Sequence, residues 1–328
     1  MLLRPLRYDL SWDLTAVDII NYPEDAKPER WTHLTLALGN FDGLHRGHMK
    51  LVERVRRRSN EKGMTAAILT FDPHPSRIVR PDKAPRLLMT NAQKFEGFAR
   101  VGIDLAAIVR FTTGLSHWKP DKFVQKLLVD WLRVSEVWVG ANFLFGHDRA
   151  GNFSLLRSLG NQYGFQVEKI DSVRYKEFVV SSTRVRRLVN EGRVDEAGAL
   201  LGHHYYIDGE VVVGAGRGRI QGCPTANLRT ENEVVPTNGV YATTVMLDGI
   251  IRPAVTNVGV RPTFGSGGER VIEAHLLDYD GDLYGSPLRL AFVQRLRDEQ
   301  AFSTSGELQR QIFEDCKRAR ALFSSISL

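Results

Sequence analysis

The fold of the first half of the chain is decided by residues 34–48, LTLALGNFDGLHRGH. A short apolar run ends at Gly39, and after a polar turn the apolar residues recur at helical spacing over 49–55. Similar strand-like runs, with helix-like stretches between them, follow at 65–71, 105–111 and 136–143. This alternation of strands and helices predicts an α/β domain in which helices cover both faces of a parallel sheet.

The pattern changes near residue 183. Two short helices are predicted over 182–202, and after them the chain is rich in β-like runs, at 205–214, 239–247, 250–259, 271–279 and 287–296. Asp248-Gly249 between two of these runs is a strong hairpin signal. A last helix is expected after Thr304, with Glu307 completing a capping box. The second half is therefore predicted to be a small antiparallel barrel or sandwich with a C-terminal helix.

Length and composition restrict the class of protein. A chain of 328 residues is longer than one typical domain, and 43% hydrophobic and 25% charged residues are ordinary for a globular protein. Charged residues interrupt the N-terminus at Arg4 and Arg7, no apolar run approaches the roughly 18 residues of a membrane span, and only two cysteines occur. These features predict a cytoplasmic protein without membrane contact.

The net charge of +6 fits either nucleic-acid affinity or a polyanionic ligand such as ATP. Because the basic residues are dispersed along the chain, a solvated surface is the better interpretation, and no nucleic-acid partner is expected.

The glycines of the first segment favour a phosphate-binding turn. Gly39, Gly43 and Gly47 allow close backbone approach to an anion, and the free amides of the following helix attract negative charge. His45 and His48 lie three residues apart, so both face the same way and are placed to donate hydrogen bonds to a phosphate in its transition state. A glycine-rich turn with two surface histidines fits this spacing equally well, and a metal pair fits it less well because no third ligand lies nearby at zinc-like spacing.

A second glycine-rich segment, GAGRGRIQGCPTAN, occupies residues 214–227. Its four glycines free the backbone to surround a phosphate chain, and Arg217 and Arg219 supply positive charge. Thr225 and Asn227 place two neutral oxygen ligands on one side of an extended segment, and Mg²⁺ prefers such donors together with substrate phosphates. By composition alone, a flexible hairpin is an equally good interpretation.

The strand predicted at 271–277 places Glu273 on the face opposite Ile272, Ala274 and Leu276. Glu273 is a candidate general base that takes a proton from an attacking hydroxyl. An antiparallel sheet with one solvated face explains the same alternation without catalysis.

Four motifs of the first half occur in the order found in bacterial FAD synthetases. GNFDGLHRGH (39–48) resembles the HxGH signature of the nucleotidyltransferase superfamily, and TFDPHP (70–75) is similar to a loop at that family's flavin site. VGANFLFGHDRAGN (139–152) and VSSTRVR (180–186) resemble two further family segments, the second of which closes on the ATP phosphates.

The resemblance implies that His45, His48 and Arg186 act on the ATP phosphates and that His74 and Pro75 line the flavin pocket. On their own, an ordinary helix cap explains the SST sequence and a rigid loop explains the PHP sequence. Further implied ATP contacts are Gly39, Asn40, Phe41, Asn142, Ser182 and Thr183.

Motifs of the second half resemble those of riboflavin kinases. The similar segments are GRGRIQGCPTAN, TNVGVRPTFG (256–265), VIEAHLLDYDGDLYG (271–285) and RLRDEQAF (295–302). The resemblance implies Glu273 as base for the ribityl 5′-hydroxyl, Thr225 and Asn227 as ligands of Mg²⁺–ATP, and Arg297 near the isoalloxazine. Implied ATP contacts of the glycine-rich loop are Gly214, Gly216, Arg217, Gly218 and Arg219. Gln221 and Cys223 depart from the family pattern without touching Thr225 or Asn227.

Over residues 34–323 the chain thus resembles the bacterial bifunctional riboflavin kinase/FAD synthetase family. The resemblance implies a Rossmann-like FMN adenylyltransferase domain at 1–186 and a riboflavin kinase domain at 187–328, a six-stranded antiparallel β-barrel with a C-terminal helix. Riboflavin, FMN and ATP are the expected small-molecule substrates, with FMN and FAD as products, Mg²⁺ as cofactor and a monomer or weak homo-oligomer as the assembly.

Two rival functions remain open from sequence. One is a nucleotidyltransferase acting on another phosphate, with the barrel as a regulatory module, and the other is a flavin- or nucleic-acid-binding protein that has lost catalysis.

Overall fold

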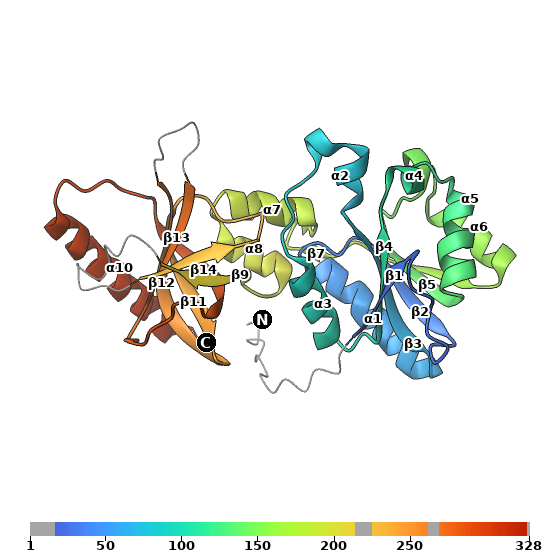
Figure 1. Ribbon diagram of the computed structural model, residues 1–328, viewed down its shortest axis with the longest axis horizontal. Coiled ribbons are helices and arrows are strands. Elements are labelled where there is room, and N and C mark those ends of the chain that lie inside the picture. Colours follow the sequence, from blue (N-terminus) through green and yellow to red (C-terminus); the bar gives the residue numbers. More distant parts are fainter. Residues whose placement is uncertain (1–16, 214–224, 262–268, 327–328) are drawn as a thin grey trace. The chain divides into compact units, whose positions relative to one another are not determined.

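The computed structural model describes residues 17–213, 225–261 and 269–326. The chain divides into two compact units, Trp12–Ser181 and Ser182–Leu328, which are considered one at a time (Figure 1). No helix in the described ranges is both long enough and apolar enough to cross a membrane.

The first unit is built on a six-stranded sheet in the order β1-β4-β3-β2-β5-β6, in which every neighbouring pair is parallel. Its strands are β1 (Asp18–Tyr22), β2 (Leu34–Leu38), β3 (Thr65–Asp72), β4 (Leu105–Arg110), β5 (Val134–Gly140) and β6 (Gln166–Ile170). The main helices are α1 (Arg46–Lys62), α3 (Asn91–Arg100), α5 (Pro120–Phe123), the π-helical η2 (Val124–Trp131) and α6 (Phe153–Tyr163). Shorter helical turns are α2 (Pro75–Val79), η1 (Pro81–Lys83), α4 (Thr113–Ser116) and η3 (His147–Arg149).

Two apolar cores lie on opposite faces of this sheet. Leu36 of β2 packs in one core with residues of η2 and α6, while the neighbouring Ala37 packs in the other with residues of α1 and α3. All five residues of β2 are buried, because strands between two helical layers have no solvated face. The α/β architecture predicted from the alternating pattern is confirmed.

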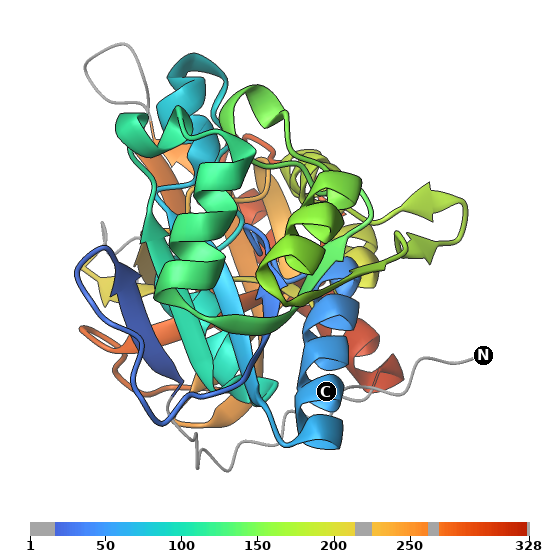
Figure 2. The same cartoon turned by 90° about the vertical axis from the view of Figure 1, so that its right-hand side faces the viewer.

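The sheet contains two strands that the apolar pattern does not reveal. Only Ile20 of β1 and Val167 of β6 are buried within their strands. Each strand lies at an edge of the sheet and therefore has no continuous apolar run. Beyond β6, the ribbon of β7 (Arg174–Tyr175) and β8 (Phe178–Val179), in yellow-green, extends away from the sheet (Figure 2).

The second unit begins with α7 (Ser182–Asn190) and α8 (Val194–Leu201), so α7 includes Ser182, which the sequence suggested as a cap. A closed six-stranded barrel follows in the order β10-β13-β12-β11-β14-β9, and all of its pairs are antiparallel. The strands are β9 (Tyr205–Val212), β10 (Ala226–Thr230), β11 (Gly239–Leu247), β12 (Ile250–Arg261), β13 (Glu269–Leu276) and β14 (Pro287–Arg297). This confirms the predicted barrel.

The predicted hairpin of the second unit is confirmed, whereas the predicted capping box is displaced by one residue. Asp248 and Gly249 both have positive φ angles, 50° and 76°, and join β11 to β12 in a two-residue hairpin. The C-terminal helix α10 (Ser305–Ser325) begins after Thr304, whose hydroxyl accepts a hydrogen bond from Glu307 N at 3.2 Å. The Glu307 carboxylate accepts from Ser303 N at 3.1 Å, one residue before the position of a standard capping box.

Candidate active sites

The turn between β2 and α1 is held in a conformation that most residues avoid. Phe41 and Leu44 have φ angles of 53° and 39°, in the left-handed region, yet both are buried. Each such residue costs about 1–3 kcal/mol and persists only where the surroundings enforce it. Here α3 enforces it: Phe98 meets Phe41 edge to face at 5.6 Å, and a Cβ on Gly97 would lie 2.2 Å from Leu44 Cδ1.

The two histidines of this turn form one stacked unit at the start of α1. His45 is the N-cap, and its Nδ1 accepts a hydrogen bond from His48 N at 3.2 Å. The two rings stack with centroids 3.7 Å apart and an interplanar angle of 14°. A Cβ on Gly47 would lie 3.1 Å from Cε1 of His45, so glycine at this position leaves room for the ring.

Burial keeps both imidazoles neutral at neutral pH. Desolvation lowers the pKa of His45 to about 4. The pKa of His48 is also well below its usual range, because of desolvation first and then the charges of His45 and Lys94. Since Nδ1 of His45 accepts a hydrogen bond, its neutral ring carries the proton on Nε2, which is then a donor for a phosphate oxygen.

The segment TFDPHP continues from β3 beside this turn. Thr70 donates a hydrogen bond to the carbonyl oxygen of Asn40 at 3.2 Å, which ties β3 to the histidine segment. His74 is the N-cap of the short helix α2 and accepts from Ser76 N at 3.2 Å, and Pro75 is the first residue of that helix. Both side chains are half-buried. The sequence suggested a rigid loop here, and the structure has a helix start.

The remaining candidates of the first half lie on two other elements. β5 ends at Gly140, so Asn142 lies in the turn beyond it and is exposed. Ser182, Thr183 and Arg186 lie on α7, in the second unit. Val180, near the end of the first unit, has its carbonyl oxygen 4.0 Å from the position of a Cβ on Gly47 of the same unit.

The second site lies on one face of the barrel, where strand register brings three polar residues into a row. Asn227 of β10 is directly opposite Glu273 of β13, and Glu273 is also directly opposite Asn257 of β12. Directly opposed residues have Cβ atoms about 4.5–5.5 Å apart and point to the same face. Thr225 directly precedes β10 and is half-buried, whereas Ala226, between it and Asn227, is buried.

Asn257 was missed from sequence as a site residue. It lies within the TNVGVRPTFG segment, but only the β12–β13 register shows that it adjoins Glu273. Glu299 lies nearby, because its Oε1 would be 2.6 Å from a Cβ on Gly259, two residues after Asn257. The other candidates of the nucleotide loop lie outside the described residues: Gly214, Gly216, Arg217, Gly218 and Arg219.

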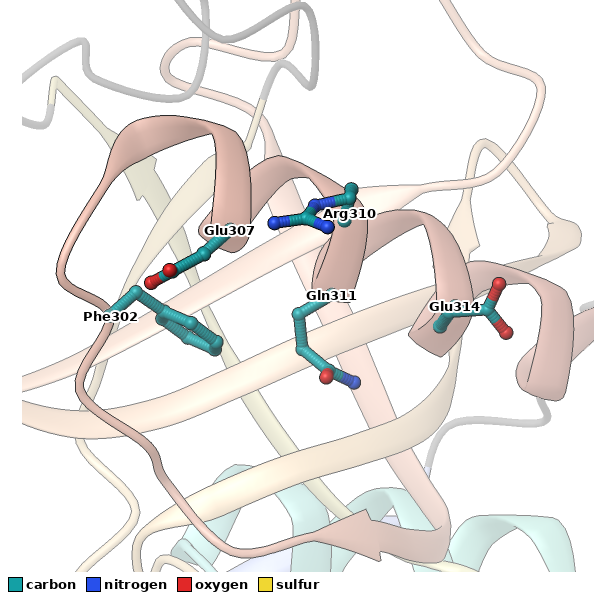
Figure 3. A pocket seen from close by; sticks show the side chains of 5 residues that line it. All are labelled: Phe302, Glu307, Arg310, Gln311 and Glu314. Atoms are coloured by element: carbon teal, nitrogen blue, oxygen red, sulfur yellow. The ribbon is translucent and has the colours of Figure 1, made fainter.

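Arg297, expected near the flavin, is engaged by the C-terminal helix. Its guanidinium binds the buried carboxylate of Asp315 through three contacts of 2.8–3.1 Å, which fastens α10 to β14. It also lies over the ring of Phe302, with Cζ 5.8 Å from the centroid. Phe302 borders an open pocket of about 300 Å³ whose other walls come from α10 (Figure 3). The lining residues are Phe302, Glu307, Arg310, Gln311 and Glu314.

Known proteins resemble both halves of the chain. Residues 27–184 match the family model described as FAD synthetase, and residues 201–323 match the one described as riboflavin kinase. The bifunctional riboflavin kinase/FMN adenylyltransferase of Pseudomonas fluorescens is 39% identical, covering 87% of this chain and 91% of the relative. The protein of the same name from Escherichia coli (strain K12) is 37% identical, covering 88% and 92%. A solved structure from Streptococcus pneumoniae, described as a macrolide-efflux protein, has a TM-score of 0.84 at 25% identity and covers 93% and 99% of the two chains.

Proposed function

The chain belongs to the bifunctional riboflavin kinase/FMN adenylyltransferase family, and on this premise we propose which residues perform each reaction. One activity phosphorylates riboflavin with ATP to give FMN, and the other joins AMP from a second ATP to FMN, giving FAD and pyrophosphate. We propose that adenylylation takes place at the His45–His48 pair and phosphorylation at the row formed by Asn227, Glu273 and Asn257.

The observation that carries this assignment is that each unit has its own arrangement for phosphate chemistry. The first has a helix N-terminus with two stacked neutral imidazoles, and the second has a carboxylate between two amides on a barrel face. Free amides at a helix start bind phosphate oxygens, and a carboxylate suits removal of a hydroxyl proton. The division also agrees with the separate family models that match residues 27–184 and 201–323.

In the first reaction site, an oxygen of the FMN phosphate attacks the α-phosphorus of ATP, and the bond from that phosphorus to the bridging oxygen breaks. His45 donates a hydrogen bond through Nε2–H to the charge that grows on the α-phosphate oxygens. The amides of the first turn of α1 bind the same group. Because the nucleophile is the FMN phosphate itself, this site needs no general base.

In the second site, the ribityl 5′-hydroxyl attacks the γ-phosphorus of ATP and ADP leaves. Glu273 takes the hydroxyl proton, and Asn257 beside it is placed to orient the hydroxyl or a phosphate oxygen. Thr225 and Asn227 offer a hydroxyl and an amide oxygen, a donor set that suits Mg²⁺ when ATP phosphates complete its coordination. Bound Mg²⁺ would neutralise charge on the transferred phosphoryl group.

We further propose an adenylyltransferase domain at 1–186 and a kinase domain at 187–328. This boundary lies inside α7, so that Ser182, Thr183 and Arg186 serve the adenylylation site as a second phosphate clamp. A hydroxyl and amides at a helix start with a cation one turn later favour an anion. A cytoplasmic location is proposed because ATP is a substrate of both reactions.

The assignment is tested with two substitutions in the full-length protein, each assayed for FMN and FAD by chromatography. Glu273→Gln is expected to slow FMN formation by at least about 100-fold and to leave FAD formation from added FMN unchanged. His48→Asn is expected to slow FAD formation from added FMN and to leave FMN formation unchanged. Glu210→Gln and His33→Asn, both on exposed residues, are the matched controls.

A Glu273→Gln protein that still makes FMN at the normal rate would refute the assigned base. Loss of both activities in either variant would refute the independence of the two sites.

A further inference from the structure

Lys94 is a buried cation that the two reaction sites described above do not use. It is the fourth residue of α3, and its exposed fraction is 6%. Across residues 17–213, 225–261 and 269–326, its ammonium forms no ion pair within 4.0 Å. Lysine is almost never buried to this degree without a partner, so its position requires an explanation.

The packing of α3 aims Lys94 at the histidine pair. Lys94, Gly97 and Phe98 are three and four residues apart, and therefore lie on one face of the helix. Gly97 and Phe98 pack against Leu44 and Phe41 of the turn before α1. The charge of Lys94 is close enough to His48 to lower the pKa of that imidazole.

The charges of two carboxylates act on Lys94, one from each of the two segments discussed. Asp42 belongs to the histidine turn and Asp72 to the TFDPHP segment, and both charges raise the pKa of Lys94. Desolvation is the larger effect, and the pKa of Lys94 remains below its usual value. Both carboxylates also accept other hydrogen bonds, Asp42 from Leu88 N at 2.8 Å and Asp72 from Asn91 Nδ2 at 3.0 Å.

A cation at this junction would favour the joining of AMP to FMN, because both reacting groups are anionic. The FMN phosphate carries nearly two negative charges at neutral pH and must approach the polyphosphate of ATP. His45 and His48 are neutral and carry no positive charge to offset this repulsion. Asp42 and Asp72, whose charges act on Lys94, belong to the segments that the resemblance assigns to ATP and to the flavin.

We propose that Lys94 binds the phosphate of FMN and holds it in line with the α-phosphate of ATP at the His45–His48 pair. This inference rests on the function proposed for the first unit. It makes Lys94 a residue that distinguishes FMN from riboflavin, because riboflavin lacks the phosphate. The alternative is that Lys94 only balances the charges of Asp42 and Asp72 and never contacts substrate.

The test measures FAD formation from added FMN by the full-length protein, with the concentrations of FMN and ATP varied separately. For Lys94→Met, kcat/KM for FMN is expected to fall about 10- to 100-fold, the range for loss of one charge-assisted hydrogen bond. The KM for ATP should change far less. Lys94→Arg should restore most of the FMN dependence, and Lys50→Met, on an exposed lysine of α1, should behave as the wild type.

Equal effects on FMN and ATP, or no effect on FMN, would overturn the proposal in favour of charge balance. If Lys94→Met loses its native tryptophan fluorescence, Lys94→Gln carries the test, because it removes the charge but keeps a polar side chain. The proposal then requires a larger change in KM for FMN than in KM for ATP, and equal changes would overturn it. If the wild-type protein makes no FAD from FMN, the proposed function of the unit itself has failed, which is a different result.

Discussion

The neutral state of His45 makes the stability of the first unit depend on pH, and we predict that His45→Asn removes part of this dependence. Asparagine keeps the capping role, since its side-chain oxygen can accept the hydrogen bond from His48 N. It has no proton to gain in acid. The substitution therefore separates the titration of residue 45 from its structural contact.

The size and sign of the effect follow from the two pKa values of His45. In the folded unit the pKa of His45 is about 4, against 6.5 for an ordinary histidine in the unfolded chain. Between these values the unfolded chain binds more protons than the folded unit, so the free energy of unfolding falls as the pH falls. For His45 alone, the loss between pH 7 and pH 5 is about 2 kcal/mol, from about 1.4 kcal/mol for each pKa unit. Below pH 4 both states are protonated and the loss is complete.

The assay is urea unfolding followed by tryptophan fluorescence between pH 5 and pH 7.5. Four of the five tryptophans, Trp31, Trp118, Trp131 and Trp138, lie among the described residues of the first unit, and no tryptophan follows residue 138, so the signal reports chiefly on that unit. The difference between wild type and His45→Asn should change by about 2 kcal/mol across this range, with the variant losing less in acid. His48 contributes in the same direction in both proteins. Parallel curves for the two proteins would refute a buried neutral His45.

Three further predictions concern single features of the two sites. Gly47→Ala places a Cβ 3.1–3.2 Å from atoms of the His45 ring, so the rate of FAD formation should fall about 10-fold while FMN formation is unchanged. Gly114→Ala is the control: its Cβ would lie 3.8 Å from the nearest atom, so both rates should be those of the wild type. Asp315→Ala removes the carboxylate partner of the largely buried Arg297 guanidinium, and should therefore lower the free energy of unfolding of the barrel by about 3 kcal/mol. Thermal unfolding followed by circular dichroism measures this change, and an unchanged unfolding temperature would show that α10 is held by other contacts. Chelation of divalent metal by EDTA should stop FMN formation and Mg²⁺ should restore it, whereas full activity in EDTA would exclude the role proposed for Thr225 and Asn227.

The sequence predicted the layers of the fold because its central strands are apolar on both sides. β2, β3 and β4 are almost fully buried, so each appears as a continuous apolar run bounded by turn residues. β1 and β6 bury one residue each and leave no such run. Edge strands are recognised through their neighbours in the sheet, which a single sequence does not contain.

The same distinction applies to the sites. The spacing of His45 and His48 is local, so their common direction could be predicted, and the rings are stacked as that direction requires. Asn257 and Lys94 are brought to their sites by strand register and helix packing, which act over long sequence separations. The lowered pKa values of the histidines depend on burial, and burial is likewise a property of the folded unit.

The central claim is that ATP is used at its γ-phosphate in one site and at its α-phosphate in the other, and isotopic labelling of ATP tests it most directly. Wild-type protein is given riboflavin, Mg²⁺ and ATP labelled with ³²P at either the α- or the γ-phosphate, and the flavins are then separated and counted. The account predicts that the γ-label enters FMN and FAD, whereas the α-label enters FAD alone. Appearance of the α-label in FMN, or FAD without any α-label, would contradict it.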